Sequence, residues 1–230
     1  MIDFDSALNR RKDLLSGFVT PQIKSVADVG CGTGLDSIAL FLLGLNVTAF
    51  DPSSEMINAA KTNSEGLETR IEFYNYAANE IPKTFYNKFD LVASLGNTLA
   101  NIPISKIEKS VSRLFKLVKK DGSLLIQILN YEKILKEKER IVNITKKDSE
   151  YFIRFYDFGM KDLTFNILRF NADQNSKKEL ISTIIFPYKS KEIKKIFRAA
   201  GIKEIKFYGS LDKKPFDSKT STDLVLFAKK

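Results

Sequence analysis

The chain has 230 residues and a net charge of +9, and its shares of apolar (43%) and charged (28%) residues are ordinary for a globular protein. One cysteine excludes an internal disulfide framework, and the lack of histidine excludes imidazole catalysis, Ser-His nucleophilic sites and histidine-containing zinc sites. No apolar run has the length of a membrane span and the first residues are unlike a signal peptide, so we expect a cytoplasmic protein with no membrane partner and no metal.

The predicted elements begin with a short helix at 4–18 and continue with apolar strands and amphipathic helices in alternation. The expected strands here are 25–29, 46–50, 71–76, 89–94 and 123–129, separated by helical patterns at 34–44, 53–64 and 104–119. Such alternation is typical of a parallel sheet with helices on both faces.

After residue 138 the pattern becomes β-rich, and no helical pattern interrupts it until residue 190. The expected strands are 139–147, 151–158, 162–171 and 179–186, joined by polar turns such as 171–178. A helix at 190–200, ended by Gly201, and an antiparallel pair of strands at 202–208 and 223–228 complete the chain.

The fold class that follows is α/β, with a doubly wound, seven-stranded, mostly parallel sheet and a small antiparallel β insertion. The sheet domain is expected to comprise residues 1–138 and 188–230. The insertion is expected at residues 139–187, near the substrate site.

Three alternate glycines follow the first predicted strand. Residues 26–36 read Val-Ala-Asp-Val-Gly-Cys-Gly-Thr-Gly-Leu-Asp, which places Gly30, Gly32 and Gly34 in a tight turn before a helix. Without a Cβ atom, such a turn lets a ligand approach the backbone closely. Asp51 ends the next strand, where a carboxylate binds ribose hydroxyls in βαβ nucleotide sites. The glycine spacing departs from the dinucleotide fingerprint, and no Lys-Ser or Lys-Thr pair follows as in a phosphate-binding loop.

This run resembles the first motif of the class I S-adenosylmethionine-dependent methyltransferases, whose sheet is Rossmann-like, and residues 50–57 resemble their acidic second motif. The resemblance implies S-adenosylmethionine as the cofactor, with its amino-acid tail on the glycine turn, its ribose on Asp51 and its adenine against Met56. Met56 as an ordinary core residue stays an alternative. The other positions that the resemblance assigns to the cofactor are Arg11, Gly30, Cys31, Gly32, Gly34, Pro52, Ala77, Ala78 and Leu95.

Three of these positions, Arg11, Ala77 and Ala78, differ from the usual pattern or have an alternative interpretation. Arg11 is expected to reach the cofactor carboxylate, as an arginine does in related enzymes, and the alternative is a solvated helix face. Ala77 and Ala78 stand where many class I enzymes have an acidic residue near the adenine amine, so backbone groups and apolar walls are expected to hold the adenine.

Asparagines follow two neighbouring strands at the edge where ligands bind in open α/β sheets. The segments Leu-Gly-Asn-Thr at 95–98 and Asn-Tyr at 130–131 resemble motifs of the glycine and sarcosine N-methyltransferases, which also carry an antiparallel insert before the last helix. The resemblance implies that Asn97 and Asn130 bind and orient a methyl acceptor, with Tyr131 beside them as a possible base. The alternatives are a turn residue at Asn97 and a helix N-cap at Asn130.

The expected function is transfer of a methyl group to a small-molecule acceptor. An amine nitrogen is favoured over a hydroxyl, because an amine needs no strong base and the chain has no histidine. Three residues of the insertion have two interpretations: either they line the acceptor pocket, or they only pack against neighbouring strands. The second interpretation is preferred for Tyr151, Arg154 and Tyr156. The alternative functions are an RNA methyltransferase and a non-catalytic module that binds S-adenosylmethionine.

The charge is unevenly distributed along the chain. Residues 1–100 hold 8 basic and 12 acidic side chains, whereas residues 101–230 hold 29 and 16. A basic half is typical of proteins that bind nucleic acid. The lysines are scattered over predicted helix faces and loops without interleaved aromatic residues, so we do not expect a nucleic-acid partner. The sequence does not indicate an oligomeric state.

Overall fold

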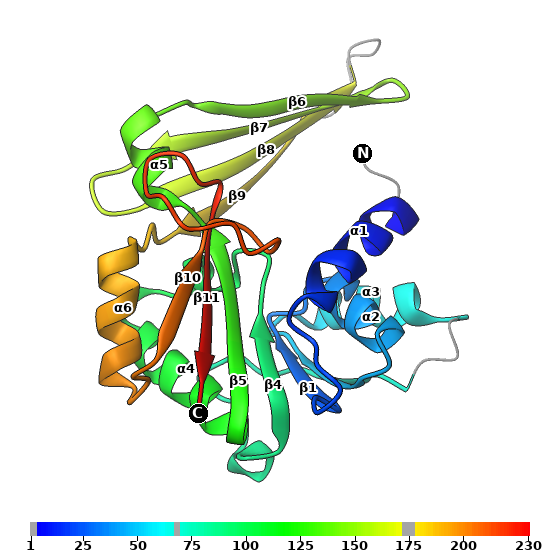
Figure 1. Ribbon diagram of the computed structural model, residues 1–230. Helices are drawn as coiled ribbons and strands as arrows, with labels where there is room; N and C mark the ends of the chain where they lie inside the picture. Colours follow the sequence, from blue (N-terminus) through cyan, green and yellow to red (C-terminus); the bar gives the residue numbers. More distant parts are fainter. Residues whose placement is uncertain (1–3, 67–69, 172–177) are drawn as a thin grey trace.

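The computed structural model describes residues 4–66, 70–171 and 178–230. Most of the polar turn expected at 171–178 lies outside these residues. The described residues form one seven-stranded and one four-stranded sheet (Figure 1). The strands of the first sheet are β1 (Ser25–Val29), β2 (Asn46–Phe50), β3 (Glu72–Tyr74), β4 (Phe89–Ser94), β5 (Val118–Leu129), β10 (Ile205–Tyr208) and β11 (Asp223–Lys229). Those of the second are β6 (Ile141–Lys147), β7 (Glu150–Phe158), β8 (Leu163–Asn171) and β9 (Glu179–Ile185).

The first sheet has the order β10-β11-β5-β4-β1-β2-β3. Strands β1 to β5 run parallel to their neighbours, and β11 pairs antiparallel with both β5 and β10. Successive side chains of these strands point to opposite faces of the sheet, and apolar side chains are buried on both faces. The strands are therefore near-continuous apolar runs in the sequence. This sheet and the antiparallel second sheet confirm the expected fold class.

Helices cover both faces of the first sheet. The helices are α1 (Phe4–Ser16), α2 (Leu35–Leu42), α3 (Ser54–Ser64), α4 (Ile104–Leu117), α5 (Tyr131–Glu137) and α6 (Ser190–Ala199), with short 3₁₀ turns η1 (Lys83–Phe85) and η2 (Thr98–Asn101). Helices α1 and α2 pack on Val26 and Leu91, while α4 and α6 share a core with Ala27 and Val92 on the other face. Adjacent residues of one strand therefore face different helical layers.

The second sheet lies beyond the end of the first at which the parallel strands finish (Figure 1). Its four strands are antiparallel neighbours in chain order, as the hairpin pattern predicted. Tyr156, Leu163 and Ile185 point from one of its faces into the main core. The strands fall within the expected insertion at 139–187, although the division into domains stays a prediction.

Several elements differ from the sequence-based expectation. Strand β5 starts at Val118, five residues early, because its first residues pair with Phe89 before a shift in register. The expected strand 71–76 is only the three-residue edge strand β3. Helix α5 was not among the elements expected in chain order, since seven residues are too few for a clear helical period, and it was expected only through the alternative that Asn130 is a helix N-cap.

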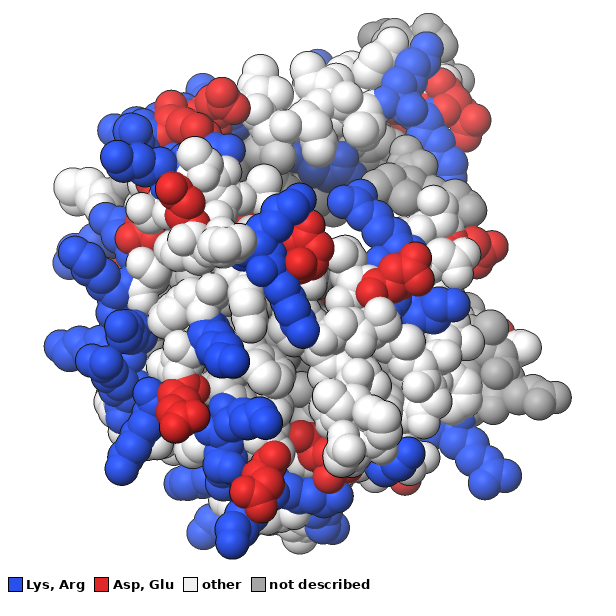
Figure 2. Space-filling model, viewed as in Figure 1, with Lys and Arg blue, Asp and Glu red and all other residues white. Residues whose placement is uncertain are grey.

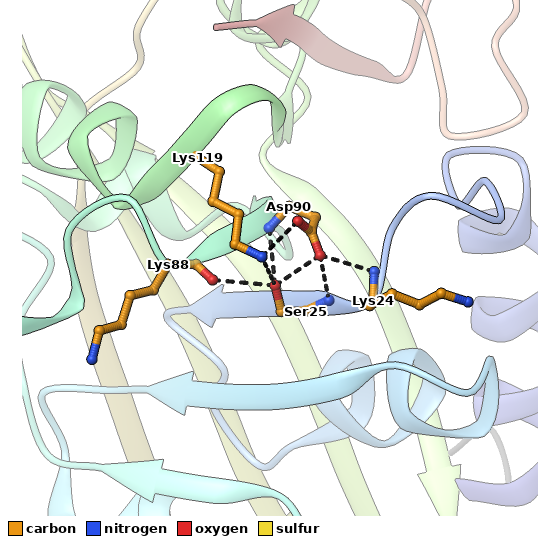
Figure 3. Close-up of polar contacts among 5 residues, drawn as sticks. All are labelled: Lys24, Ser25, Lys88, Asp90 and Lys119. Carbon is orange, nitrogen blue, oxygen red and sulfur yellow. Dashed lines mark hydrogen bonds and ion pairs between the residues drawn. The ribbon is translucent and has the colours of Figure 1, made fainter.

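A polar cluster ties the opposite, amino-terminal edge of the parallel strands together (Figure 3). The Asp90 carboxylate accepts hydrogen bonds from the backbone N–H groups of Lys24 and Ser25, at 3.0 and 2.8 Å, and from the Ser25 hydroxyl. Lys119 forms an ion pair with Asp90 at 2.8 Å. These hydrogen bonds and this ion pair hold the pKa of Asp90 well below its usual range despite partial burial. The cluster lies at the edge away from the glycine turn and is structural.

Among the described residues no helix is long and apolar enough to cross a membrane. Basic side chains lie among acidic and uncharged ones over the face seen in Figure 2, and they are densest at the edge that carries α6. The expectation that nucleic acid is not a partner stays a prediction.

Candidate active site

The glycine turn is fixed to the end of β2 by its own backbone. The N–H groups of Gly30 and Cys31 both donate to the carbonyl oxygen of Phe50, at 2.7 and 3.1 Å. The next N–H group, of Gly32, donates to Oδ2 of Asp51 at 2.9 Å. The glycine turn and the acidic residue, 19 positions apart in sequence, thus form one continuous unit.

The three glycines have left-handed backbone conformations, but their surroundings differ. A Cβ atom on Gly30 would lie 2.2 Å from a side-chain carbon of Thr98, and one on Gly34 would lie 3.0 Å from Cβ of Ala60. These two glycines are needed for packing within the chain. A Cβ atom on Gly32, where φ is +53°, would meet nothing within 4 Å. Gly32 is therefore the position at which backbone is open to a ligand.

Asp51 and helix α3 form the second wall of the site. The Asp51 carboxylate, 8% exposed, accepts through Oδ1 from the N–H of Ser53 at 2.9 Å. Each of its oxygens holds one backbone N–H and keeps a further lone pair for a ligand hydroxyl. The Ser53 side chain caps α3 by accepting from the N–H of Met56. Met56 is 41% exposed, so the interpretation of it as a core residue is wrong.

A buried carboxylate lies under the turn. Asp28 accepts from the Ser37 hydroxyl at 2.6 Å, while its Oδ1 has no hydrogen-bond partner among the described residues. Burial and the nearby Asp36 carboxylate raise the pKa of Asp28 from 3.8 to about 7. An unsatisfied buried oxygen beside a site is a place where a ligand N–H group is accommodated.

Arg11 of α1 is engaged with the protein itself. It forms an ion pair with Asp36 at the start of α2, with a further contact of 3.2 Å between Nη2 and Oδ2. The alternative of a solvated helix face is wrong, because the Arg11 side chain is only 19% exposed. Its predicted contact with a cofactor carboxylate stays a prediction.

The loop after β4 brings Asn97 against the glycine turn. The Thr98 hydroxyl donates to the carbonyl oxygens of Leu95 and Gly30, at 2.8 and 3.1 Å. Asn97 has a positive φ of 70°, a turn conformation that asparagine tolerates. Its Nδ2 donates to the Tyr131 hydroxyl oxygen at 2.7 Å, and its Oδ1 accepts from the N–H of Leu129.

Tyr131 and Asn130 are both buried, with 1% exposed surface each. Burial raises the pKa of the Tyr131 phenol, so this side chain is neutral at physiological pH and is a hydrogen-bonding group rather than an anionic base. Asn130 is the N-cap of α5, accepting from the N–H of Lys133, and its Nδ2 donates to the carbonyl oxygens of Ser218 and Ser221. Both ends of the Asn130 amide thus bind protein; its contact with an acceptor stays a prediction.

The remaining predicted residues differ in their burial, and their roles in the site stay predictions. Leu95 and Cys31 are buried, and burial raises the pKa of the Cys31 thiol, which makes it an inert apolar group. Pro52 is exposed, Ala77 is half-buried and Ala78 is buried. In the second sheet, Tyr151 stacks on Phe170 and Arg154 donates to Asn143, which is the strand packing that was preferred for them.

Gln127 is a residue of the candidate site that the sequence analysis missed. Its Oε1 accepts from the N–H of Gly96 at 2.8 Å, and its Nε2 donates to Oδ1 of Asp223 at 3.1 Å. Gln127 thereby fixes the loop that carries Asn97. The sequence did carry a signal, since Gln127 is a polar residue within the otherwise apolar run 124–129.

The set of donors and acceptors suits a nucleoside with an amino-acid tail. Gly32 offers open backbone, Asp51 offers lone pairs to a diol, and Asp28 offers an unsatisfied oxygen. The exposed thioether of Met56 offers an apolar surface to a flat ring. The residues therefore fit the cofactor that the first two motifs imply.

Comparisons with known proteins agree with this geometry. Residues 26–122 match a family described as a methyltransferase domain. Glycine N-methyltransferase of Homo sapiens is 33% identical over 124 residues, which cover 48% of this chain and 42% of the human protein. The chain thus matches less than half the length of that relative.

Two further similarities extend over more of the chain. Glycine/sarcosine N-methyltransferase of Aphanothece halophytica is 23% identical over 195 residues, covering 81% of this chain and 69% of that protein. The crystal structure of an S-adenosylmethionine-dependent methyltransferase from Clostridium acetobutylicum superposes with a TM-score of 0.81 at 16% identity, covering 99% of this chain and 92% of the other. At that identity the structural match shows the fold.

Proposed function

We propose that this protein transfers a methyl group from S-adenosylmethionine to a small-molecule acceptor, at an amine nitrogen. The match of residues 26–122 to a family described as a methyltransferase domain supports this proposal. The observation that carries the proposal is the turn around Gly32, which is open on its ligand side and bonded to the Asp51 carboxylate. The similarity to glycine and sarcosine N-methyltransferases supports the amine acceptor.

The residues that would hold the cofactor lie at or after the ends of four strands, β1 to β4. The glycine turn and Asp28 would hold the amino-acid tail, Asp51 the ribose, and Met56 with Ala77 and Ala78 the adenine. Leu95 would close the apolar side of the cofactor site. When bound, S-adenosylmethionine supplies a methyl group that is already activated as a sulfonium, so the protein mainly provides positioning and exclusion of water.

Asn97 is the residue best placed to orient an acceptor. It is half-buried beside the glycine turn, and Tyr131 and the backbone of Leu129 fix both ends of its amide. A fixed amide orients a polar acceptor without reorganising during the reaction. With the Tyr131 phenol neutral and no histidine in the chain, an acceptor that needs no strong base is favoured.

The first test is binding of S-adenosylmethionine by isothermal titration calorimetry. We expect the wild-type protein to bind, and Asp51→Ala to bind about tenfold or more weakly, because two ribose hydroxyls lose a charged acceptor. Lys61→Ala, which alters an exposed residue of the adjoining helix α3, is the control and should bind normally. Failure of the wild-type protein to bind would overturn the proposed function.

The acceptor class is tested by the formation of S-adenosylhomocysteine with small amines, the matching alcohols, amino acids and RNA. Turnover with amines supports the proposal. Binding of the cofactor without turnover on any of these would indicate a non-catalytic module. Turnover with RNA alone, together with steeply salt-dependent RNA binding, would indicate an RNA methyltransferase.

A further inference from the structure

A cavity of about 910 Å³ opens between α1 and the segment 209–223 that leads into β11. Leu35, the residue after the glycine turn, forms part of its wall, and Arg11 of α1 forms another part. Asp223 lines it from the start of β11, where it pairs with Leu129 at the end of β5. The cavity therefore lies at the carboxyl edge of the parallel strands, next to the proposed cofactor site, and is large enough for a small molecule.

Asp223 is a half-buried carboxylate with only one oxygen engaged by a side chain. Gln127 donates to its Oδ1 at 3.1 Å, and the other end of the Gln127 amide accepts from the N–H of Gly96. One side chain thus connects Asp223 to the loop that carries Asn97. Burial raises the pKa of Asp223, and the Gln127 hydrogen bond and the charge of Arg11 offset only part of this rise.

Asp212, which also lines the cavity, and Asp36, whose partner Arg11 lines it, already have cationic partners. Asp36 is paired with Arg11, and Asp212 is paired with Lys214 at 2.9 Å. Among the described residues Asp223 takes part in no ion pair, although the chain carries a net charge of +9. Arg11 lines the same cavity and acts on Asp223 at a distance, but it is already paired with Asp36. A partly desolvated carboxylate outside any ion pair favours a ligand that brings a positive charge or several N–H donors.

We propose that Asp223 is the residue that selects the acceptor, by binding the amino group of a small amine in this cavity. The proposal rests on the proposed function for the identity of the cavity as the acceptor site. Gln127 holds the carboxylate in place, and the same side chain fixes the Gly96 loop, so the amine would be held beside Asn97. An alcohol of the same shape offers one O–H donor and no positive charge, so it would bind more weakly.

The test compares Asp223→Asn with the wild-type protein on benzylamine and benzyl alcohol, a pair that differs only in the amine. Asparagine is isosteric and still accepts the Gln127 hydrogen bond, so the variant should fold, which a thermal melt checks. Asp13→Asn, an exposed site on α1 outside the cavity lining, makes the same change of charge and is the control.

Two readouts are used. Saturation-transfer NMR without the cofactor should show benzylamine bound to wild type and to Asp13→Asn, and about tenfold weaker binding to Asp223→Asn. Turnover of a small amine that the wild-type protein accepts should show KM raised about tenfold in Asp223→Asn with little change in kcat. Asp223→Glu should recover part of the loss in each readout.

The proposal is overturned if Asp223→Asn keeps the wild-type preference for the amine over the alcohol in the NMR measurement. It is equally overturned if the KM for an amine does not change. Calorimetry with S-adenosylmethionine separates this result from failure of the proposed function, because Asp223→Asn should bind the cofactor normally. Wild-type protein that binds benzylamine through Asp223 but does not bind the cofactor would defeat the proposed function and leave an amine-binding cavity.

Discussion

Substitution of Gly32 by alanine separates the cost of backbone strain from the loss of ligand binding. A non-glycine residue in the left-handed region costs about 1–2 kcal/mol. Because φ of Gly32 is +53° and its added methyl group would meet nothing within 4 Å, this strain is the whole expected loss of stability. In a chain of this size, each kcal/mol lowers Tm by about 2–4 °C.

The same methyl group would occupy the space in which we place the cofactor. Calorimetry should therefore show S-adenosylmethionine bound to Gly32→Ala about tenfold or more weakly, which corresponds to about 1.4 kcal/mol. The Gly32 N–H group, which holds Asp51, remains in alanine, so the loss would come from the methyl group alone.

Gly44→Ala is the matched control. Gly44 also has a positive φ, of +84°, and a Cβ atom added to it would meet nothing within 4 Å. It lies just before the start of β2, however, at the amino-terminal ends of the parallel strands and away from the glycine turn. It should lose a similar amount of stability and bind the cofactor as wild type does. Wild-type affinity in Gly32→Ala would refute our placement of the ligand against this turn.

Three further predictions concern charge and hydrogen bonding. Because the pKa of Asp28 is raised, its contribution to the stability of the folded state is present below pH 3.8 and is lost as the pH rises through about 7. Asp28→Asn should therefore be more stable than wild type at pH 8, by about 1 kcal/mol or more, and equally stable at low pH. Urea denaturation of both proteins at each pH checks this prediction. The lowered pKa of Asp90 has the opposite effect on the pH dependence of stability. The free energy of unfolding of Asp90→Asn should be about 1–3 kcal/mol below that of wild type at pH 7, and this difference should shrink as the pH falls below 3.8. A difference that does not change with pH would contradict the role of the Asp90–Lys119 ion pair. Tyr131→Phe removes the hydroxyl oxygen to which the Asn97 amide donates. Turnover should fall about tenfold, while the affinity for the cofactor should not change. An unchanged kcat/KM would show that the Asn97 amide does not need this hydrogen bond.

Local patterns account for most of the fold prediction. Alternating apolar and helical segments up to residue 129, and hairpin-like segments after residue 138, correspond closely to the two sheets. Errors occurred where local signals are weak, as in the seven residues of α5 and the early start of β5. Burial and strand pairing, which depend on distant residues, decide such segments.

The candidate site was predicted as positions but not as contacts. Asn97 and Tyr131 were expected at the same edge of the sheet, yet nothing in the sequence showed that one donates a hydrogen bond to the other. Asn130 was expected either to bind an acceptor or to be a helix N-cap. The structure confirms the N-cap and adds that the Asn130 amide binds the backbone of the segment before β11.

The sequence by itself predicted the glycine turn and the acidic residue after β2, because those features lie within one βαβ unit, and the resemblance of these motifs to a known family implied the ligand. Only the tertiary structure decided that Gly32, among three glycines, is the open one, since Thr98 and Ala60 fill the space beside the others. It also decided that Gln127 joins Gly96 to Asp223 across 31 and 96 positions of sequence. Such contacts follow from strand order and pairing register, which no local pattern encodes.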